Sequence, residues 1–384
     1  MGNQKINIGW YQINMEKNRC KRNGTLEFFR FVFCMFVLLR HAERYVLGEP
    51  VLDKGVFFDF FPHGAIGVEF FFLLTGLFMA RSVDKELQTH TTSGSLAEDT
   101  VKFVWKKYAS VFPYHIVVFV IIFPVMASIR QYDWFHTLLL LVDSIPDILL
   151  IQMAGFMPSN LNAFEWYIST MIFALAILYP LCKKHFEMFT KVIAPVASLL
   201  ILGYLGKECG RLTGVLVWNG LYYRGMIRGV AEIMLGAFAY HLCKNYLAKQ
   251  RGHISAAKRV GLTVLEWVCY TAVVFFVIMT FPNKYEFGAL FLIFTGVVLS
   301  YSDLTYTGKL LNNRVSYFLG KLSLPIYLSQ TCAIHITKEL LYFLDESTRV
   351  MLVVVLTFVF AGITLVLGDL LNTLTKNKKQ PAIQ

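Results

Sequence analysis

The stretch EFFRFVFCMFVLLRH, residues 27–41, sets ionisable side chains in a segment that is otherwise mostly apolar. At about 100° per residue, the step from Arg30 to His41 returns a helix to within about 20° of one face, and Glu27 lies about 40° from His41. Polar groups at membrane depth are costly unless they face a partner or a cavity, so this stripe indicates a functional site. The alternative is that Arg30 and His41 simply reach opposite membrane surfaces.

The composition predicts an all-α, polytopic membrane helical bundle. The 384 residues are 56% hydrophobic and 16% charged, with a mean hydropathy of +0.54, whereas soluble domains carry about 25% charged residues. The net charge of +11 comes from Lys and Arg clustered between apolar segments, as membrane topology requires. We therefore expect contact with membrane lipids and no nucleic acid. No cysteine pair has metal-ligand spacing, so we predict no metal site.

About ten stretches are apolar and long enough to cross roughly 30 Å of hydrocarbon. They are residues 27–46, 64–80, 111–129, 164–182, 190–206, 226–243, 260–281, 287–302, 318–337 and 350–372.

Charge fixes the expected topology of these spans. Residues 137–154 carry acidic residues in their middle, and treating them as an extracytoplasmic re-entrant or interfacial hairpin keeps the Lys- and Arg-rich loops on one side. Both termini are then cytoplasmic. We predict a basic segment at 1–26, a ten-span membrane domain at 27–372 and a tail at 373–384. No internal repeat is evident, which argues against a transporter.

Other ionisable groups lie inside or beside the predicted spans. Glu69 needs a buried partner, for which Arg228, His41 and His63 are candidates. Arg228 and Glu232 are one helical turn apart, which favours an ion pair that is either functional or purely structural.

Two positions at the ends of spans allow both a binding role and a plain anchoring role. Glu165 adjoins Trp166 at the outer start of the fourth predicted span, where aromatic residues also serve as interfacial anchors. Lys106 and Lys107 precede the third span and suit either a phosphate-rich ligand or a lipid headgroup.

Five short motifs occur in order along the chain. They are Glu27, Arg30 and His41; Gly67-Val-Glu-Phe-Phe71 with Thr75-Gly76; Trp166–Ser169 with Tyr179-Pro-Leu181; Arg228, Glu232 and Gly236; and Gly320-Lys321, Ser323 and Ile326-Tyr-Leu328. Together they resemble the membrane acyltransferase type 3 family, integral-membrane enzymes that O-acylate bacterial surface sugars. The resemblance covers nearly the whole chain.

The resemblance implies an O-acyltransferase of the bacterial inner (plasma) membrane. Its co-substrate would be an acyl-CoA, with acetyl-CoA expected, and its acceptor a hydroxyl of a cell-surface or lipid-linked saccharide; no permanently bound cofactor is expected. A carrier or flippase of the same fold is the alternative function. Acylation on the cytoplasmic face is a further possibility.

The resemblance and the residue chemistry together suggest roles for individual side chains. His41 would act as general base or transient acyl carrier, together with Glu27 and Arg30. The donor would be bound by Arg30, Lys106, Lys107 and Tyr114, and the acceptor by Glu69, Glu165, Trp166, Arg228 and Glu232.

Two positions depart from the family pattern. Lys107 and Ser110 stand where the family commonly has Arg-x-x-Arg, and a lysine cannot copy the bidentate phosphate contact of arginine. The last motif usually ends in His, where this chain has Gln330, which forms hydrogen bonds but does not carry a proton. His335 lies five residues further on, which is the wrong helix face to replace it.

Overall fold

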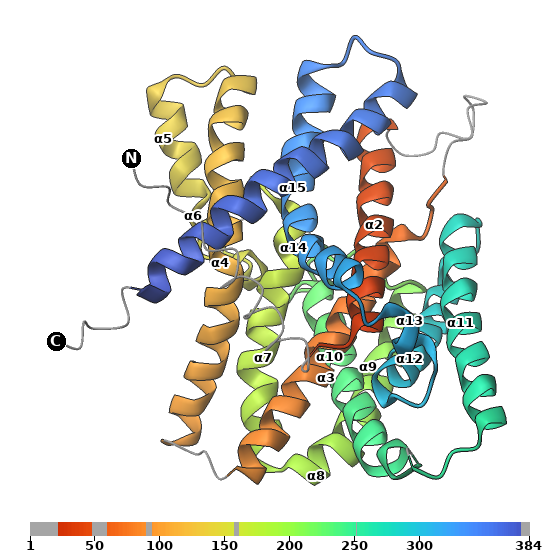
Figure 1. The fold of residues 1–384 in the computed structure, drawn as a ribbon. Helices are drawn as coiled ribbons and strands as arrows, with labels where there is room; N and C mark the ends of the chain where they lie inside the picture. Colours follow the sequence, from red (N-terminus) through yellow and green to blue (C-terminus); the bar gives the residue numbers. More distant parts are fainter. Residues whose placement is uncertain (1–21, 48–59, 90–93, 157–160, 251, 378–384) are drawn as a thin grey trace, which may run out of the picture.

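The computed structural model describes residues 22–47, 60–89, 94–156, 161–250 and 252–377. Helices make up most of this part of the chain, and it contains no β-strand. The fold is therefore the all-α bundle that the composition predicts (Figure 1). Most of the basic segment 1–26 and the end of the tail 373–384 lie outside the described residues.

The α-helices follow one another with short connections. They are α2 (Gly24–Leu47), α3 (Gly67–Gln88), α4 (Leu96–Ile129), α5 (Trp134–Asp143), α6 (Ile145–Ile148), α7 (Trp166–Lys184), α8 (Phe186–Met188), α9 (Ala194–Cys209), α10 (Arg224–Leu242), α11 (Ala256–Ile278), α12 (Glu286–Ser302), α13 (Thr307–Leu311), α14 (Arg314–His335) and α15 (Glu346–Asn377).

Eight helical segments in the described ranges are long and apolar enough to cross a membrane. The other two predicted spans correspond to α2 and α14, which have 24 and 22 residues. Both carry more polar side chains than the eight, since the sequence motifs place polar residues on them. The protein is thus an integral membrane protein whose most polar long helices, α2 and α14, pack against each other.

The region 137–154 is broken into short pieces. Helix α5 has ten residues, ends at Ser144 and is followed by the one-turn helix α6. Ten helical residues span about 15 Å, half of a hydrocarbon core. The position of this hairpin relative to the membrane stays a prediction.

Helices α3 and α10 meet through two glycines. A Cβ on Gly76 would overlap the carbonyl oxygen of Ile233, and a Cβ on Gly236 would overlap the carbonyl oxygen of Leu73. Each backbone therefore lies where a side chain would be on its partner. Small residues allow this close approach between helices in membranes.

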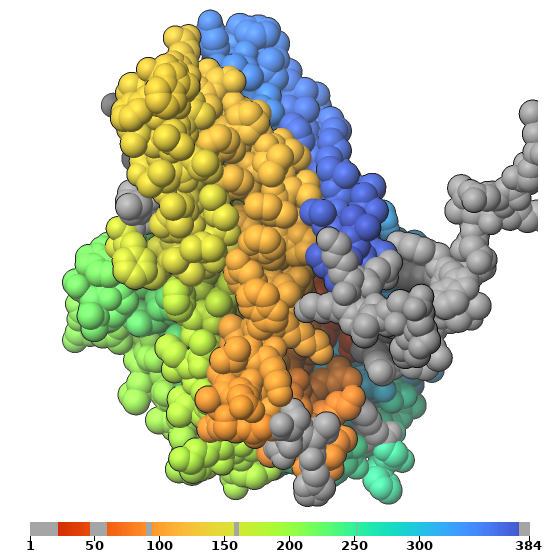
Figure 2. Space-filling view, turned by 90° about the vertical axis from the view of Figure 1, so that its left-hand side faces the viewer, coloured from red at the N-terminus to blue at the C-terminus, as the bar shows by residue number. Residues whose placement is uncertain are grey.

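Helices α3 and α4 reach further than the predicted spans, which ended at residue 80 and began at residue 111. Ser95 caps α4 by accepting from the backbone N–H of Glu98, whose carboxylate accepts from the Ser95 N–H in return. The expected polar connector 82–100 is therefore largely helical. Figure 2 shows α4 running along one face, beside α5 in yellow and α15 in blue.

Candidate functional site

Glu27 and Arg30 form an ion pair on α2, at 3.2 Å between Glu27 Oε2 and Arg30 Nη1. The pair faces Gly320 of α14, where any Cβ would overlap the Glu27 carboxylate. A glycine in the last motif is thus required for α14 to approach this acid. Glu27 is buried, whereas Arg30 keeps 26% of its side chain exposed.

His41 lies further along the same helix and contacts two other segments. Its Nδ1 is 3.1 Å from Oε1 of Gln330 on α14. Its ring stacks on Phe164, with centroids 4.1 Å apart and planes inclined by 15°. The polar stripe predicted on this helix is therefore divided, because His41 has its own partners and does not contact the Glu27–Arg30 pair.

Tyr327 holds both neighbours of His41. Its backbone carbonyl accepts from Nε2 of Gln330 at 2.8 Å, and its hydroxyl donates to the carbonyl oxygen of Phe164. Asn162 also ties this segment to α14 by accepting from the hydroxyl of Thr331 at 2.6 Å. The neighbours of His41 are thus fixed by hydrogen bonds to one helix.

A cavity of about 590 Å³ lies between α3, α4 and α7. Its lining contains four lysines and two acids: Lys85, Lys102, Lys106, Lys107, Glu86 and Asp99. Two of these lysines are the predicted donor-binding pair. The other two lie in the helical extensions that the sequence reading assigned to a connector, so their contribution was missed.

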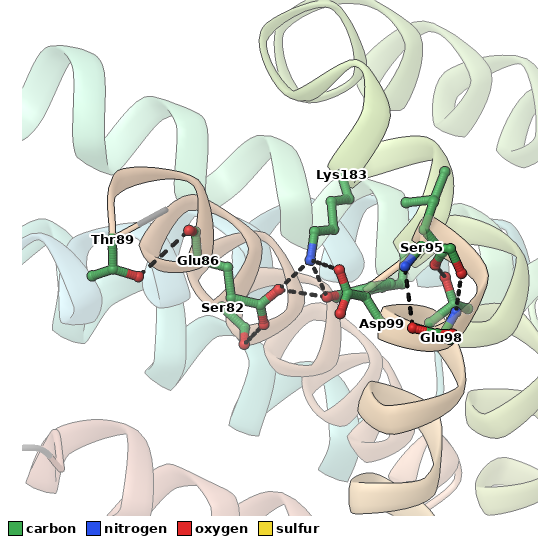
Figure 3. A network of polar contacts seen from close by, with 10 residues as sticks. Ser82, Glu86, Thr89, Ser95, Glu98, Asp99 and Lys183 are labelled. Carbon is green, nitrogen blue, oxygen red and sulfur yellow. Dashed lines mark hydrogen bonds and ion pairs between the residues drawn. The ribbon is translucent and has the colours of Figure 1, made fainter. Parts of the chain in front are cut away.

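Lys183 of α7 engages both acids of the cavity wall (Figure 3). Its Nζ donates to Oε2 of Glu86 and to Oδ2 of Asp99, each at 2.9 Å, and the hydroxyl of Tyr179 donates to the same Glu86 oxygen at 2.6 Å. The two carboxylates are therefore neutralised from within the protein. The lysines of the lining leave an excess of positive charge, which suits an anionic ligand.

Arg30 and Lys107 come together from different helices. The charges of Arg30 and Lys106 both act on the ammonium group of Lys107, which also lies 5.6 Å from the ring centroid of Phe103. Like charges that converge in this way favour a bound anion such as phosphate.

Tyr114, the fourth predicted donor-binding residue, has a different set of contacts. Its hydroxyl donates to Oδ1 of Asp369 on α15 at 2.7 Å. Lys321 of α14 is 2.6 Å from the other carboxylate oxygen of Asp369. Tyr114 is thus part of a junction between three helices, and a contact with the donor stays a prediction.

Arg228 is enclosed in a buried cluster. Its guanidinium lies 2.5 Å from Glu69 and 2.9 Å from Glu232, and Nη1 donates to the carbonyl oxygen of Leu212 at 2.9 Å. Trp166 packs on the same guanidinium at 5.7 Å. Among the three partners proposed for Glu69, the structure selects Arg228. All four of these residues are at most 7% exposed, so their contact with an acceptor stays a prediction.

Glu165 pairs with His115, a residue that the sequence analysis passed over. Nδ1 of His115 is 2.8 Å from Oε1 of Glu165, and Nε2 is 3.2 Å from the carbonyl oxygen of Ile148. Both groups are buried. An imidazole inside an apolar span is the same signal that identified His41 and would have identified His115. The predicted acceptor contact of Glu165 is likewise untested.

Comparison with known proteins gives one match. A family model described as an acyltransferase domain matches residues 23–368. No curated protein and no solved structure matches the chain. The matched range includes both the lysine-lined cavity and the surroundings of His41.

Proposed function

Because this chain belongs to the membrane acyltransferase type 3 family, we propose that it transfers an acyl group, acetyl in the simplest case, from acyl-CoA to a saccharide hydroxyl. The acceptor would be a cell-surface or lipid-linked saccharide at a bacterial inner membrane. Family membership supports an acyltransferase, and the donor and acceptor belong to the proposal.

The observation that carries the proposal is the pair of polar regions on α2. Arg30 adjoins Lys107 at the lysine-lined cavity, which suits the phosphates of a coenzyme A thioester. His41 is eleven residues further on, about 16 Å along the helix, and has the Gln330 and Phe164 contacts described above. One helix thus bears a cation for the donor and an imidazole for the chemistry.

The proposed reaction needs one proton acceptor. As the hydroxyl oxygen of the sugar bonds to the thioester carbonyl carbon, His41 takes the hydroxyl proton. The C–S bond then breaks, and the proton passes to the coenzyme A thiolate. In the two-step form, an imidazole nitrogen of His41 carries the acyl group first, the thiolate leaves, and the sugar hydroxyl attacks the acyl-imidazole.

Membranes containing the protein test this function when they are incubated with radiolabelled acetyl-CoA and a saccharide extract. We expect label in the saccharide, and a loss of about 10²–10⁴-fold in kcat for His41→Ala, the usual contribution of a positioned base. His136→Ala serves as the control, because His136 is an exposed histidine of α5. If His41→Ala transfers label as fast as wild type, His41 does not perform the chemistry.

The same experiment separates the alternatives. A carrier or flippase would move lipid-linked sugar without forming a labelled product. Acylation on the cytoplasmic face would give labelled product in inside-out vesicles supplied with acceptor only on their outer surface. Neither alternative has a specific observation in its favour, so acyl transfer remains the proposed function.

A further inference from the structure

The side-chain amide of Gln330 has a fixed orientation. Its Nε2 donates to the carbonyl oxygen of Tyr327 at 2.8 Å, so its Oε1 lies towards His41. The opposite orientation would place Oε1 against that carbonyl oxygen, and two acceptors cannot form a hydrogen bond. Gln330 is completely buried, so water does not offer another partner.

This orientation determines where a neutral His41 carries its ring proton. Oε1 is only an acceptor, so the nitrogen that faces it at 3.1 Å, Nδ1, must be the one that donates. The other nitrogen, Nε2, then holds the lone pair. No described residue forms a hydrogen bond with Nε2. Both the base and the acyl-carrier role of His41 need that lone pair.

His115 provides a contrast within the same protein. Both of its ring nitrogens face acceptors, the Glu165 carboxylate and a backbone carbonyl, so both nitrogens carry protons and no lone pair is left for chemistry. His41 faces one acceptor only. The hydrogen-bond partners thus distinguish a histidine that is available for chemistry from one that holds the structure together.

We propose that Gln330 is a positioning residue, which keeps the proton of neutral His41 on Nδ1 and presents Nε2 for acyl transfer. This inference rests on the proposed function for its catalytic meaning. It also explains how the chain tolerates glutamine where the family usually has histidine, since an amide oxygen is sufficient to select the tautomer and needs no proton of its own.

The tautomer itself can be measured without donor or acceptor. Full-length protein labelled with ¹⁵N-histidine in lipid bilayers gives separate NMR signals for protonated and unprotonated ring nitrogens, and subtraction of a His41→Gln spectrum assigns those of His41. At neutral pH we expect the unprotonated signal on Nε2 in wild type. Gln330→Met, which removes the acceptor, should shift the population towards the other tautomer.

The kinetic arm uses a matched set of variants. Gln330→Met should lower kcat about tenfold, the bias that one net hydrogen bond gives, with KM changed less than twofold. Gln330→Glu keeps an acceptor oxygen and should restore both the tautomer and most of kcat. Gln152→Met is the control, because Gln152 is also buried and neither side-chain polar atom has a hydrogen-bond partner.

Several outcomes overturn the inference. They are an unprotonated Nδ1 in wild type, an unchanged tautomer in Gln330→Met, and an equal loss of activity in the Gln330→Met and Gln330→Glu variants. If wild-type protein acylates no saccharide, the proposed function fails, but the NMR result still decides the tautomer. The two failures are therefore distinguishable.

Discussion

Replacing Lys183 by Met should destabilise the protein strongly, because it leaves two acids of the cavity wall without their cation. The Lys183 side chain is 6% exposed, and those of Asp99 and Glu86 are 8% and 28% exposed. Breaking a buried ion pair costs about 3–5 kcal/mol, whereas an exposed pair contributes about 0–1 kcal/mol. Since Asp99 is buried and Glu86 is partly exposed, we expect a loss of about 3–5 kcal/mol.

Thermal unfolding in detergent measures this loss. At roughly 2 °C per kcal/mol for a large chain, the melting temperature should fall by about 6–10 °C. Lys184→Met is the matched control, because Lys184 is the adjacent, exposed lysine, and it should change the melting temperature by less than about 2 °C.

A second set of variants tests the electrostatic reasoning. Adding Glu86→Gln and Asp99→Asn to Lys183→Met removes the unpaired charges, so the triple variant should regain most of the lost stability. If the triple variant is less stable than Lys183→Met alone, the loss comes from packing rather than charge. In the single variant the KM for acyl-CoA should also rise, because uncompensated carboxylates repel the donor phosphates.

Three further predictions concern other parts of the molecule. Lys106→Gln with Lys107→Gln should raise the KM for acyl-CoA about tenfold in steady-state assays and weaken its salt dependence; the exposed pair Lys191→Gln with Lys249→Gln should do neither. Gly320→Ala should cost about 1–3 kcal/mol in thermal unfolding, because its methyl group would overlap the Glu27 carboxylate, whereas Gly362→Ala, with open space around it, should stay within about 0.5 kcal/mol. Hydrogen bonds from Ser347 and Thr348 hold the pKa of Asp345 below its usual range, so its contribution to stability is present above the unfolded-state value and is lost as the pH falls; the melting temperature of Asp345→Asn should depend less on pH in the acidic range.

The sequence predicted the class of fold because hydrocarbon imposes a length and a polarity on each span. It was less accurate about helix ends. The extensions of α3 and α4 carry lysines, which lower hydropathy, and only the capping box at Ser95 marked the start of α4. Since the lysine-lined cavity is built from those extensions, half of its lysines could not be found from hydropathy.

The candidate site was predicted in its residue types but not in its pairings. Periodicity placed Arg30 and Glu27 on one face, and they are indeed paired. The contact between His41 and Gln330 joins residues that are 289 positions apart, and helical periodicity does not relate separate helices. The resemblance identified Gln330 only as a departure, and its role as a partner required the packing of α14 on α2.

The interlocked glycines of α3 and α10 have a mechanical consequence. With each backbone seated in the space left by the missing Cβ of the other, these helices resist sliding by a turn past each other. Helix α3 forms one wall of the lysine-lined cavity, so that wall is anchored to the centre of the bundle. Any widening that admits a bulky donor must then come from the opposite wall, where α4 moves as a lever about its junction with α15 at Tyr114 and Asp369.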